Sequence, residues 1–84
     1  MTVKKGRVRP RSIADLKNDE EALLQRIDLP ADFGGRLMEL GFLPGHPVRA
    51  LRSAPSGDPR VYLVEGVEIA LRRETSLHLL IEGS

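Results

Sequence analysis

Residues 37–58 read LMELGFLPGHPVRALRSAPSGD and decide the fold. The segment begins as an apolar helical face, which ends at Leu40 and Gly41. Glycine can follow a helix in the left-handed conformation without a Cβ clash, so we expect Gly41 just after the helix C-cap. Pro44 and Gly45 are the residue types that occupy the centre of a type II turn. The helix therefore leads directly into a sheet.

One helix is expected before this turn, at residues 30–40. Phe33, Leu37 and Leu40 recur at i, i+4 and i+7 and so share one stripe, which we expect to face the core. Asp32 lies in the first turn, where a carboxylate interacts favourably with the helix dipole. The spacing predicts an amphipathic helix whose apolar side is buried.

Two consecutive glycines, Gly34 and Gly35, lie within this predicted helix. Each glycine costs roughly 1 kcal/mol relative to alanine in a helix interior. Two interpretations stay open for this pair. Either the helix begins only at residue 35 or 36, or the backbone at the glycines closely approaches another element.

Hydrophobic alternation and turn signals predict five short strands. They cover residues 22–27, 48–53, 60–65, 67–72 and 77–82. The inward-facing positions of the last two strands are expected to be Val67, Ile69, Leu71, Leu77, Leu79 and Ile81. The junction at residues 65–66 is short enough for a tight hairpin. Ser12 is expected to cap a short helical turn at residues 12–16, and residues 73–76 form a single turn. These elements predict a mainly β fold, a small β-barrel of about five strands with one α-helix and a short helical turn.

The turns above, the loop at residues 54–59 and the strand GVEIALR at residues 66–72 resemble the ferrous-iron transport protein A (FeoA) family. The similarity runs from about residue 12 to residue 82. The resemblance implies an SH3-like barrel. It also implies a small cytoplasmic accessory protein that binds the membrane-embedded ferrous-iron transporter (FeoB type) and modulates it. The predicted organisation is a basic tail at residues 1–11 and an SH3-like FeoA-type domain at residues 12–84.

The composition limits the possible functions. Eighty-four residues make one domain, and a chain of this length buries only roughly 60% of its unfolded surface, which leaves little room for a deep catalytic cavity. The chain has no cysteine, so a disulfide framework and a thiolate metal site are excluded. Its apolar runs are far shorter than the roughly 18 residues needed to span a bilayer, and the N-terminus lacks the apolar core of a signal peptide. We therefore expect a cytoplasmic binding protein.

The net charge of +1 hides a basic N-terminus. The first eleven residues carry five basic side chains and no acidic one, whereas residues 12–84 carry eight basic and twelve acidic side chains. Residues 1–10 contain too few apolar side chains to fold by burial, and we expect them to be mobile. The tail is interpreted either as a solubilising segment or as a weak contact to anionic lipid headgroups, near which each basic residue contributes about 1 kcal/mol.

The sequence contains no catalytic constellation. It has no His-Asp-Ser or Cys-His set, no Gly-rich phosphate loop and no paired carboxylates in an apolar setting. His46 and His78 lie on different predicted elements and are expected at the surface. A first-row metal site needs several converging ligands, so we predict neither a metal site nor a cofactor. The protein is predicted not to be an enzyme and to have no small-molecule substrate.

The predicted partner site consists of six residues in two turns. They are Leu43, Pro44, Pro55, Ser56, Gly57 and Asp58. In the second turn, prolines stiffen the chain and Gly57 permits an unusual backbone angle, so the shape is set before binding. Ser56 stands where the FeoA family usually has leucine, so an apolar anchor is missing from the loop. The loop is otherwise a surface turn, and Leu43 either stays exposed or seals the end of the barrel.

Two other functions are weighed against the accessory role. Small barrels often bind nucleic acid, but this needs a basic track and aromatic stacking platforms, and the only aromatic residues are Phe33, Phe42 and Tyr62. The second alternative is a stand-alone regulator of metal uptake, related to the SH3-like domain of iron-dependent repressors. Those domains follow a DNA-binding helical domain, which this sequence does not contain before Ser12, so we expect the accessory role.

Overall fold

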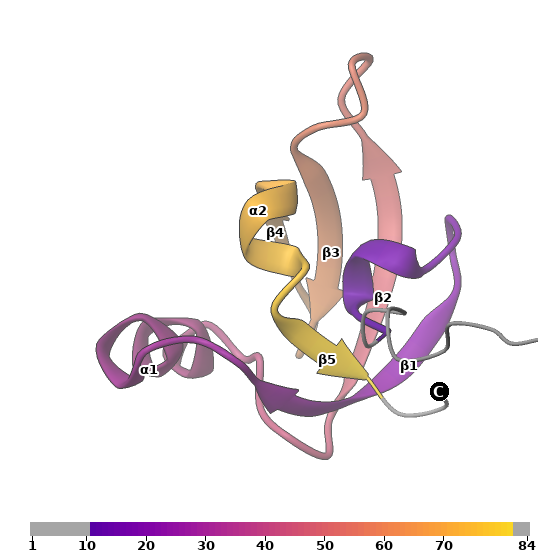
Figure 1. Cartoon of the computed structure of the whole chain (residues 1–84). Coiled ribbons are helices and arrows are strands. Elements are labelled where there is room, and N and C mark those ends of the chain that lie inside the picture. The colour runs from indigo at the N-terminus through magenta and orange to yellow at the C-terminus, as the bar shows by residue number, and fades with distance from the viewer. Residues whose placement is uncertain (1–10, 82–84) are drawn as a thin grey trace, which may run out of the picture.

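The computed structural model describes residues 11–81 of the protein, and Figure 1 shows its arrangement. In chain order the elements are η2 (Ile13–Asp15), β1 (Glu21–Ile27), α1 (Ala31–Glu39), β2 (Pro47–Ser53), β3 (Arg60–Val64), β4 (Val67–Leu71), α2 (Arg73–Ser76) and β5 (Leu79–Ile81). This order of helices and strands is the predicted one. We expected residues 1–10 to be mobile, but these residues lie outside the described range, so this stays a prediction. Among residues 11–81, no helix has the length and apolar character needed to cross a bilayer.

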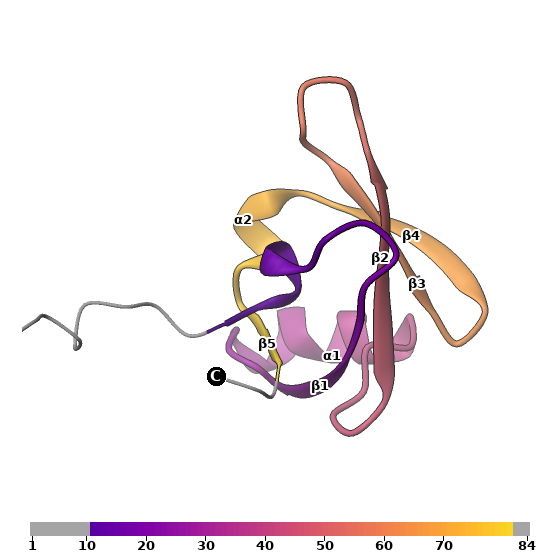
Figure 2. The same cartoon turned by 90° about the vertical axis from the view of Figure 1, so that its right-hand side faces the viewer.

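The five strands form one antiparallel sheet in the order β4-β3-β2-β1-β5. β5 pairs with β1, where Leu24 lies opposite Ile81, and not with its chain neighbour β4. The sheet curls strongly in both views, and α2 links its two edge strands (Figures 1 and 2). The mainly β fold class is therefore confirmed. Within residues 11–81 the two edge strands are not paired with each other, so the barrel is open.

The β3–β4 hairpin closes at Glu65 and Gly66, as predicted. Glu65 has φ 49° and Gly66 has φ 77°, the two positive angles that a type I′ turn requires. Val64 and Val67 lie opposite each other at its base. Val67 is nevertheless 52% exposed, so its predicted inward orientation is wrong. The hairpin tip extends beyond the core (Figure 2), and burial along β4 is reached only at Leu71.

The last strand, β5, is buried along its whole length. Leu79 and Ile81 are buried as predicted, and Leu80 between them is buried as well. Ser12 forms an isolated bridge with Leu80 and η2 packs on β5, so the face that alternation assigned to solvent is covered. Leu77 was predicted to begin this strand and face inward. It is instead the half-buried C-cap of α2, because the preceding helical turn continues through Ser76.

The core lies inside the curl of the sheet. Its buried apolar members are Ile13, Leu16, Leu24, Leu37, Phe42, Val48, Ala50, Tyr62, Val64, Leu71, Leu79 and Ile81. The predicted cap at Ser12 is confirmed, because Ser12 Oγ accepts a hydrogen bond from Ala14 N at 3.2 Å and Asp15 Oδ2 accepts one from Ser12 N at 2.8 Å. This reciprocal capping box fixes the turn that carries Ile13 and Leu16 into the core.

The end of α1 has the geometry predicted from Gly41. Leu40 is the C-cap, and Gly41 has φ 115°. Phe42 N donates to Leu37 O at 3.1 Å, and Gly41 N donates to Met38 O at 3.0 Å. These two hydrogen bonds form a Schellman motif, in which a residue with positive φ turns the chain back over the last carbonyls. The motif carries Phe42 directly into the core, where it is fully buried.

Both glycines of α1 lie inside the helix, which begins at Ala31. A late helix start is therefore wrong, and the other interpretation, an approach too close for a side chain, does not hold at either glycine. A Cβ added to Gly34 would lie 3.5 Å from Ile27 Cγ2, which is an ordinary van der Waals contact. A Cβ added to Gly35 would meet no atom within 4 Å. A methyl group thus fits at both positions, and packing accounts for neither glycine.

Gly35→Ala is expected to raise the free energy of unfolding by about 1 kcal/mol, because alanine loses less backbone entropy in a helix interior. For a domain of this size such a gain raises Tm by about 4–8 °C, which thermal unfolding followed by circular dichroism measures. Gly41→Ala is the matched control and should lower Tm, because φ is 115° and the added Cβ would lie 3.2 Å from Glu65 Cγ. An unchanged or lowered Tm for Gly35→Ala would contradict its place inside the helix.

Candidate functional site

The two ends of the sheet carry different kinds of surface. Figures 1 and 2 both place α1 and the turn after it at one end, and the β2–β3 loop at the opposite end. We call residues 31–46 the helix end and residues 54–59 the loop end. β2 runs between them, and its seven residues span roughly 20 Å.

At the helix end, Phe33 and Leu40 are exposed, so their predicted place in the core is wrong. Phe33 is 47% and Leu40 is 48% exposed, whereas Leu37 is only 4% exposed. The helix lies beside the end of the sheet and not across it (Figure 1), so it buries only Gly34 and Leu37. At about 100° per residue, Phe33 and Leu40 fall on one line at the border of that buried face. We call this pair the helix stripe.

Three further large apolar side chains of the described residues are exposed. They are Leu23, Met38 and Val67. Met38 lies about 140° around the helix from Phe33, on the other border of the buried face. Val67 follows the hairpin turn whose Glu65 side chain lies against Gly41, so the hairpin tip adjoins the end of α1. Exposed apolar side chains therefore lie on both borders of the buried face of α1 and at the adjoining hairpin tip.

The predicted turn at Leu43 and Pro44 also lies at the helix end. His46 N donates to Leu43 O at 3.0 Å, and Gly45 has φ 89°, which confirms a type II turn. Gly45 N also donates to Leu24 O at 2.7 Å, so the turn is tied to β1. Pro44 is exposed and Leu43 is half-buried. A partner can therefore contact Pro44 fully and Leu43 in part.

The two histidines are exposed, as predicted. His46 Nδ1 lies 2.7 Å from Glu65 Oε2, a contact that joins the turn after α1 to the β3–β4 turn. His78 lies on a different element, just before β5. Within the part of the chain that the structure describes, no group of three or more His, Cys, Asp or Glu side chains is placed to hold a metal ion.

At the loop end, the β2–β3 loop is held by its own hydrogen bonds. Gly57 N donates to Ala54 O at 2.7 Å, and Ser56 Oγ donates to Asp58 O at 2.9 Å. Gly57 has φ 93°, the unusual backbone angle that the sequence predicted. The tip, residues 55–57, is exposed. The six predicted partner residues thus fall into two groups at opposite ends of β2.

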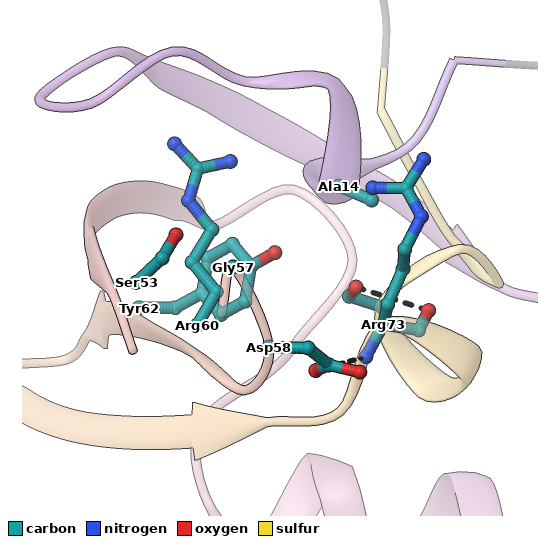
Figure 3. Close-up of a pocket in the computed structure, with 8 residues that line it drawn as sticks. Ala14, Ser53, Gly57, Asp58, Arg60, Tyr62 and Arg73 are labelled. Carbon is teal, nitrogen blue, oxygen red and sulfur yellow. Dashed lines mark hydrogen bonds between the residues drawn. The ribbon is translucent and has the colours of Figure 1, made fainter. Parts of the chain in front are cut away.

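A cavity of about 120 Å³ opens at the base of this loop (Figure 3). Its lining residues come from η2, β2, the loop, β3 and α2: Ala14, Ser53, Gly57, Asp58, Arg60, Tyr62, Arg73 and Ser76. Asp58 Oδ1 accepts a hydrogen bond from Arg73 N at 2.9 Å, which ties the loop to α2. The sequence analysis named Asp58 only as a partner contact and missed both arginines. The sheet register, in which Arg60 lies opposite Leu71, brings the arginines together, and no local motif marks them.

The family follows from a comparison with known proteins. A family model for the FeoA domain matches residues 11–83. The chain belongs to the FeoA family. The curled five-stranded sheet is the SH3-like fold that the resemblance implied.

Relatives of known sequence or structure agree with this membership. The Fe(2+) transport protein A/Fe(2+) transporter FeoB fusion protein of Porphyromonas gingivalis is 27% identical over 70 residues, which are 83% of this chain and only 8% of the fusion protein. The solution structure of iron(II) transport protein A from Clostridium thermocellum gives a TM-score of 0.79 at 25% identity and covers 84% of this chain and 44% of that one. FeoA of Stenotrophomonas maltophilia, complexed with zinc and described as a prokaryotic SH3 domain protein, gives 0.73 at 28% identity, with 84% and 88% covered.

Proposed function

We propose that this protein is a non-catalytic accessory protein of ferrous iron uptake, which docks on the cytoplasmic part of a FeoB-type transporter and modulates it. The observation that carries the proposal is the Porphyromonas gingivalis fusion, in which a related FeoA domain and the transporter share one chain. A covalent link holds two modules at high effective concentration, which favours modules that work in contact. Docking of this kind places the protein in the cytoplasm.

The helix end is the surface best suited to such docking. The helix stripe offers two apolar side chains that are each about half exposed, on a helix that the described residues leave uncovered on that side. The exposed Pro44 lies at the same end, in a turn that is already fixed by its hydrogen bonds to Leu43 and Leu24. A preformed surface loses little conformational entropy on binding, so most of the apolar contact contributes to affinity.

Affinity capture from membranes tests the proposed partner. The full chain, carried on a resin, should retain the FeoB-type transporter of its own organism. A second bait carries glutamine at Lys4, Lys5, Arg7 and Arg9, which removes charge from the tail without shortening the chain. Retention by both baits supports docking through the domain. Failure of both baits, or retention of nucleic acid in place of the transporter, overturns the proposal.

The loop end is tested separately by Ser56→Leu, which supplies the leucine that the family usually has. Ser56 is exposed, and its hydroxyl bonds only within the loop, to Asp58 O. Because the loop lies across the length of β2 from the helix stripe, we expect the transporter Kd to stay within about twofold of the unmodified chain. Titration of labelled protein with the solubilised transporter measures this. A tenfold lower Kd would show that the transporter contacts the loop and not the helix stripe.

A further inference from the structure

The cavity at the loop end is positively charged overall. Its lining contains two guanidinium groups, those of Arg60 and Arg73, against the single carboxylate of Asp58. That carboxylate already accepts a hydrogen bond from Arg73 N at 2.9 Å. Figure 3 shows the Arg73 guanidinium at the other side of the cavity, near Ala14 and away from the carboxylate. The positive charge of the Arg73 guanidinium is therefore not paired with the Asp58 carboxylate.

Arg60 is held in place, and one of its buried donors has no partner among the described residues. One terminal nitrogen, Nη2, donates to Asn18 Oδ1 at 2.9 Å, and Cζ lies 5.9 Å from the centre of the Tyr62 ring. Its Nε is buried and has no hydrogen-bond partner among the described residues. A buried donor without an acceptor is costly, and native structures usually supply a partner for it. An acceptor that enters beside Arg60 would remove this cost.

Neutral donors complete the lining. Tyr62 is only 1% exposed, yet it lines the cavity, and Figure 3 shows its hydroxyl on the side that faces Arg73. Ser53 brings a second hydroxyl from the end of β2. Hydroxyl and guanidinium donors placed around one space are the usual surroundings of a bound carboxylate or phosphate.

The size of the cavity restricts what can enter. Sites for whole small molecules are usually about 300–1,000 Å³, and this cavity is far smaller, at about 120 Å³. The geometry points to a binding site for a single oxyanion group, a phosphate or a carboxylate, with Arg60 and Arg73 as charged donors and Tyr62 as a neutral one. The site lies at the opposite end of β2 from the helix stripe. Anion binding can therefore be tested independently of transporter docking.

Titration of the full chain with inorganic phosphate and, separately, with acetate tests this site. Two-dimensional NMR spectra are recorded at constant ionic strength, with chloride as the reference anion. We expect saturable shifts at Gly57, Arg60 and Arg73, including the side-chain Nε–H signals. Saturation by phosphate alone identifies a phosphate site, and saturation by acetate alone identifies a carboxylate site. Shifts that are linear in both anions, or that spread over the whole surface, overturn the proposal.

Single substitutions distinguish a built site from general attraction to positive charge. Arg73→Gln should raise the Kd of the effective anion about tenfold, the loss expected for one charge-assisted hydrogen bond. Arg60→Lys keeps the charge but removes the buried Nε–H, and it should raise Kd as well. The control is Arg52→Gln, since Arg52 is exposed and pairs with Glu68 outside the cavity. An equal effect of the control, or no effect of both cavity variants, contradicts the site.

Discussion

The double variant Phe33→Asp, Leu40→Asp is expected to weaken binding to the FeoB-type transporter by about 1,000-fold. Both side chains are about half exposed and share one line on α1, so a partner can bury both in one contact. A well-buried apolar anchor contributes about 2 kcal/mol or more, and each 1.4 kcal/mol is about tenfold in Kd. A carboxylate at such a position adds the cost of its desolvation. Equilibrium binding of the labelled full chain to the solubilised transporter measures the loss.

Met38→Asp is the matched control on the same helix. Met38 is 43% exposed, close to the exposure of the stripe residues, but it lies on the other border of the buried face. We expect its Kd to stay within about twofold of the unmodified chain. Both variants should keep the urea midpoint of the unmodified chain, because neither removes a buried side chain. Equal losses in the control and the double variant would show that the helix stripe is not the contact.

Phe42→Ala is expected to lower the free energy of unfolding by about 3–5 kcal/mol. Phe42 is fully buried, and the Schellman motif at Gly41 directs it among Leu37 and the other core residues. Truncation to alanine removes the apolar ring and leaves a cavity that close-packed neighbours fill only in part. Total stabilities are about 5–15 kcal/mol, so a loss of this size leaves the domain marginal. Urea unfolding followed by circular dichroism gives the value.

The matched comparison is Phe33→Ala, the same chemical change at the other phenylalanine. Phe33 is 47% exposed, so less of its ring leaves water on folding, and we expect a change of at most about 0.5 kcal/mol. The two variants together test whether the structure assigns the two phenylalanines correctly. Similar losses at both positions would mean that α1 packs on the core through the stripe, as the helical spacing first indicated.

Turns were the part of the fold that the sequence predicted best. Gly41, Gly45, Gly57 and Gly66 all have positive φ, and each lies where a cap or turn was expected. These predictions succeed because the preference of glycine for such angles is local and does not depend on the rest of the chain. The cap at Ser12 was predictable for the same reason, since its capping box is complete within four residues.

Which side of an element is buried was predicted less well. Helical spacing grouped Phe33, Leu37 and Leu40, but spacing cannot say that α1 lies beside the sheet and buries only the side that carries Leu37. Val67 was placed inward by strict alternation, although the hairpin tip extends beyond the core. Leu80 was placed outward, although η2 packs on β5. Each error has the same cause, because burial depends on neighbours that are distant in the sequence.

The candidate sites show the same difference between features set by local sequence and features set by distant neighbours. Leu43, Pro44 and the loop tip at residues 55–57 were named from turn residues, and the structure places them in turns. The cavity between Arg60 and Arg73 was not predicted, because it exists only once β3, β4 and α2 have been paired and folded together. A buried arginine nitrogen without a partner is visible only in three dimensions.

The central claim is that a preformed apolar surface of this small domain binds the transporter. Isothermal titration of the purified FeoB-type transporter with the unmodified 84-residue chain, repeated at several temperatures, tests it most directly. We expect saturable one-to-one binding with a negative heat-capacity change, which is the marker of apolar burial. No saturable binding, or saturable binding without a negative heat-capacity change, would contradict docking through the helix stripe.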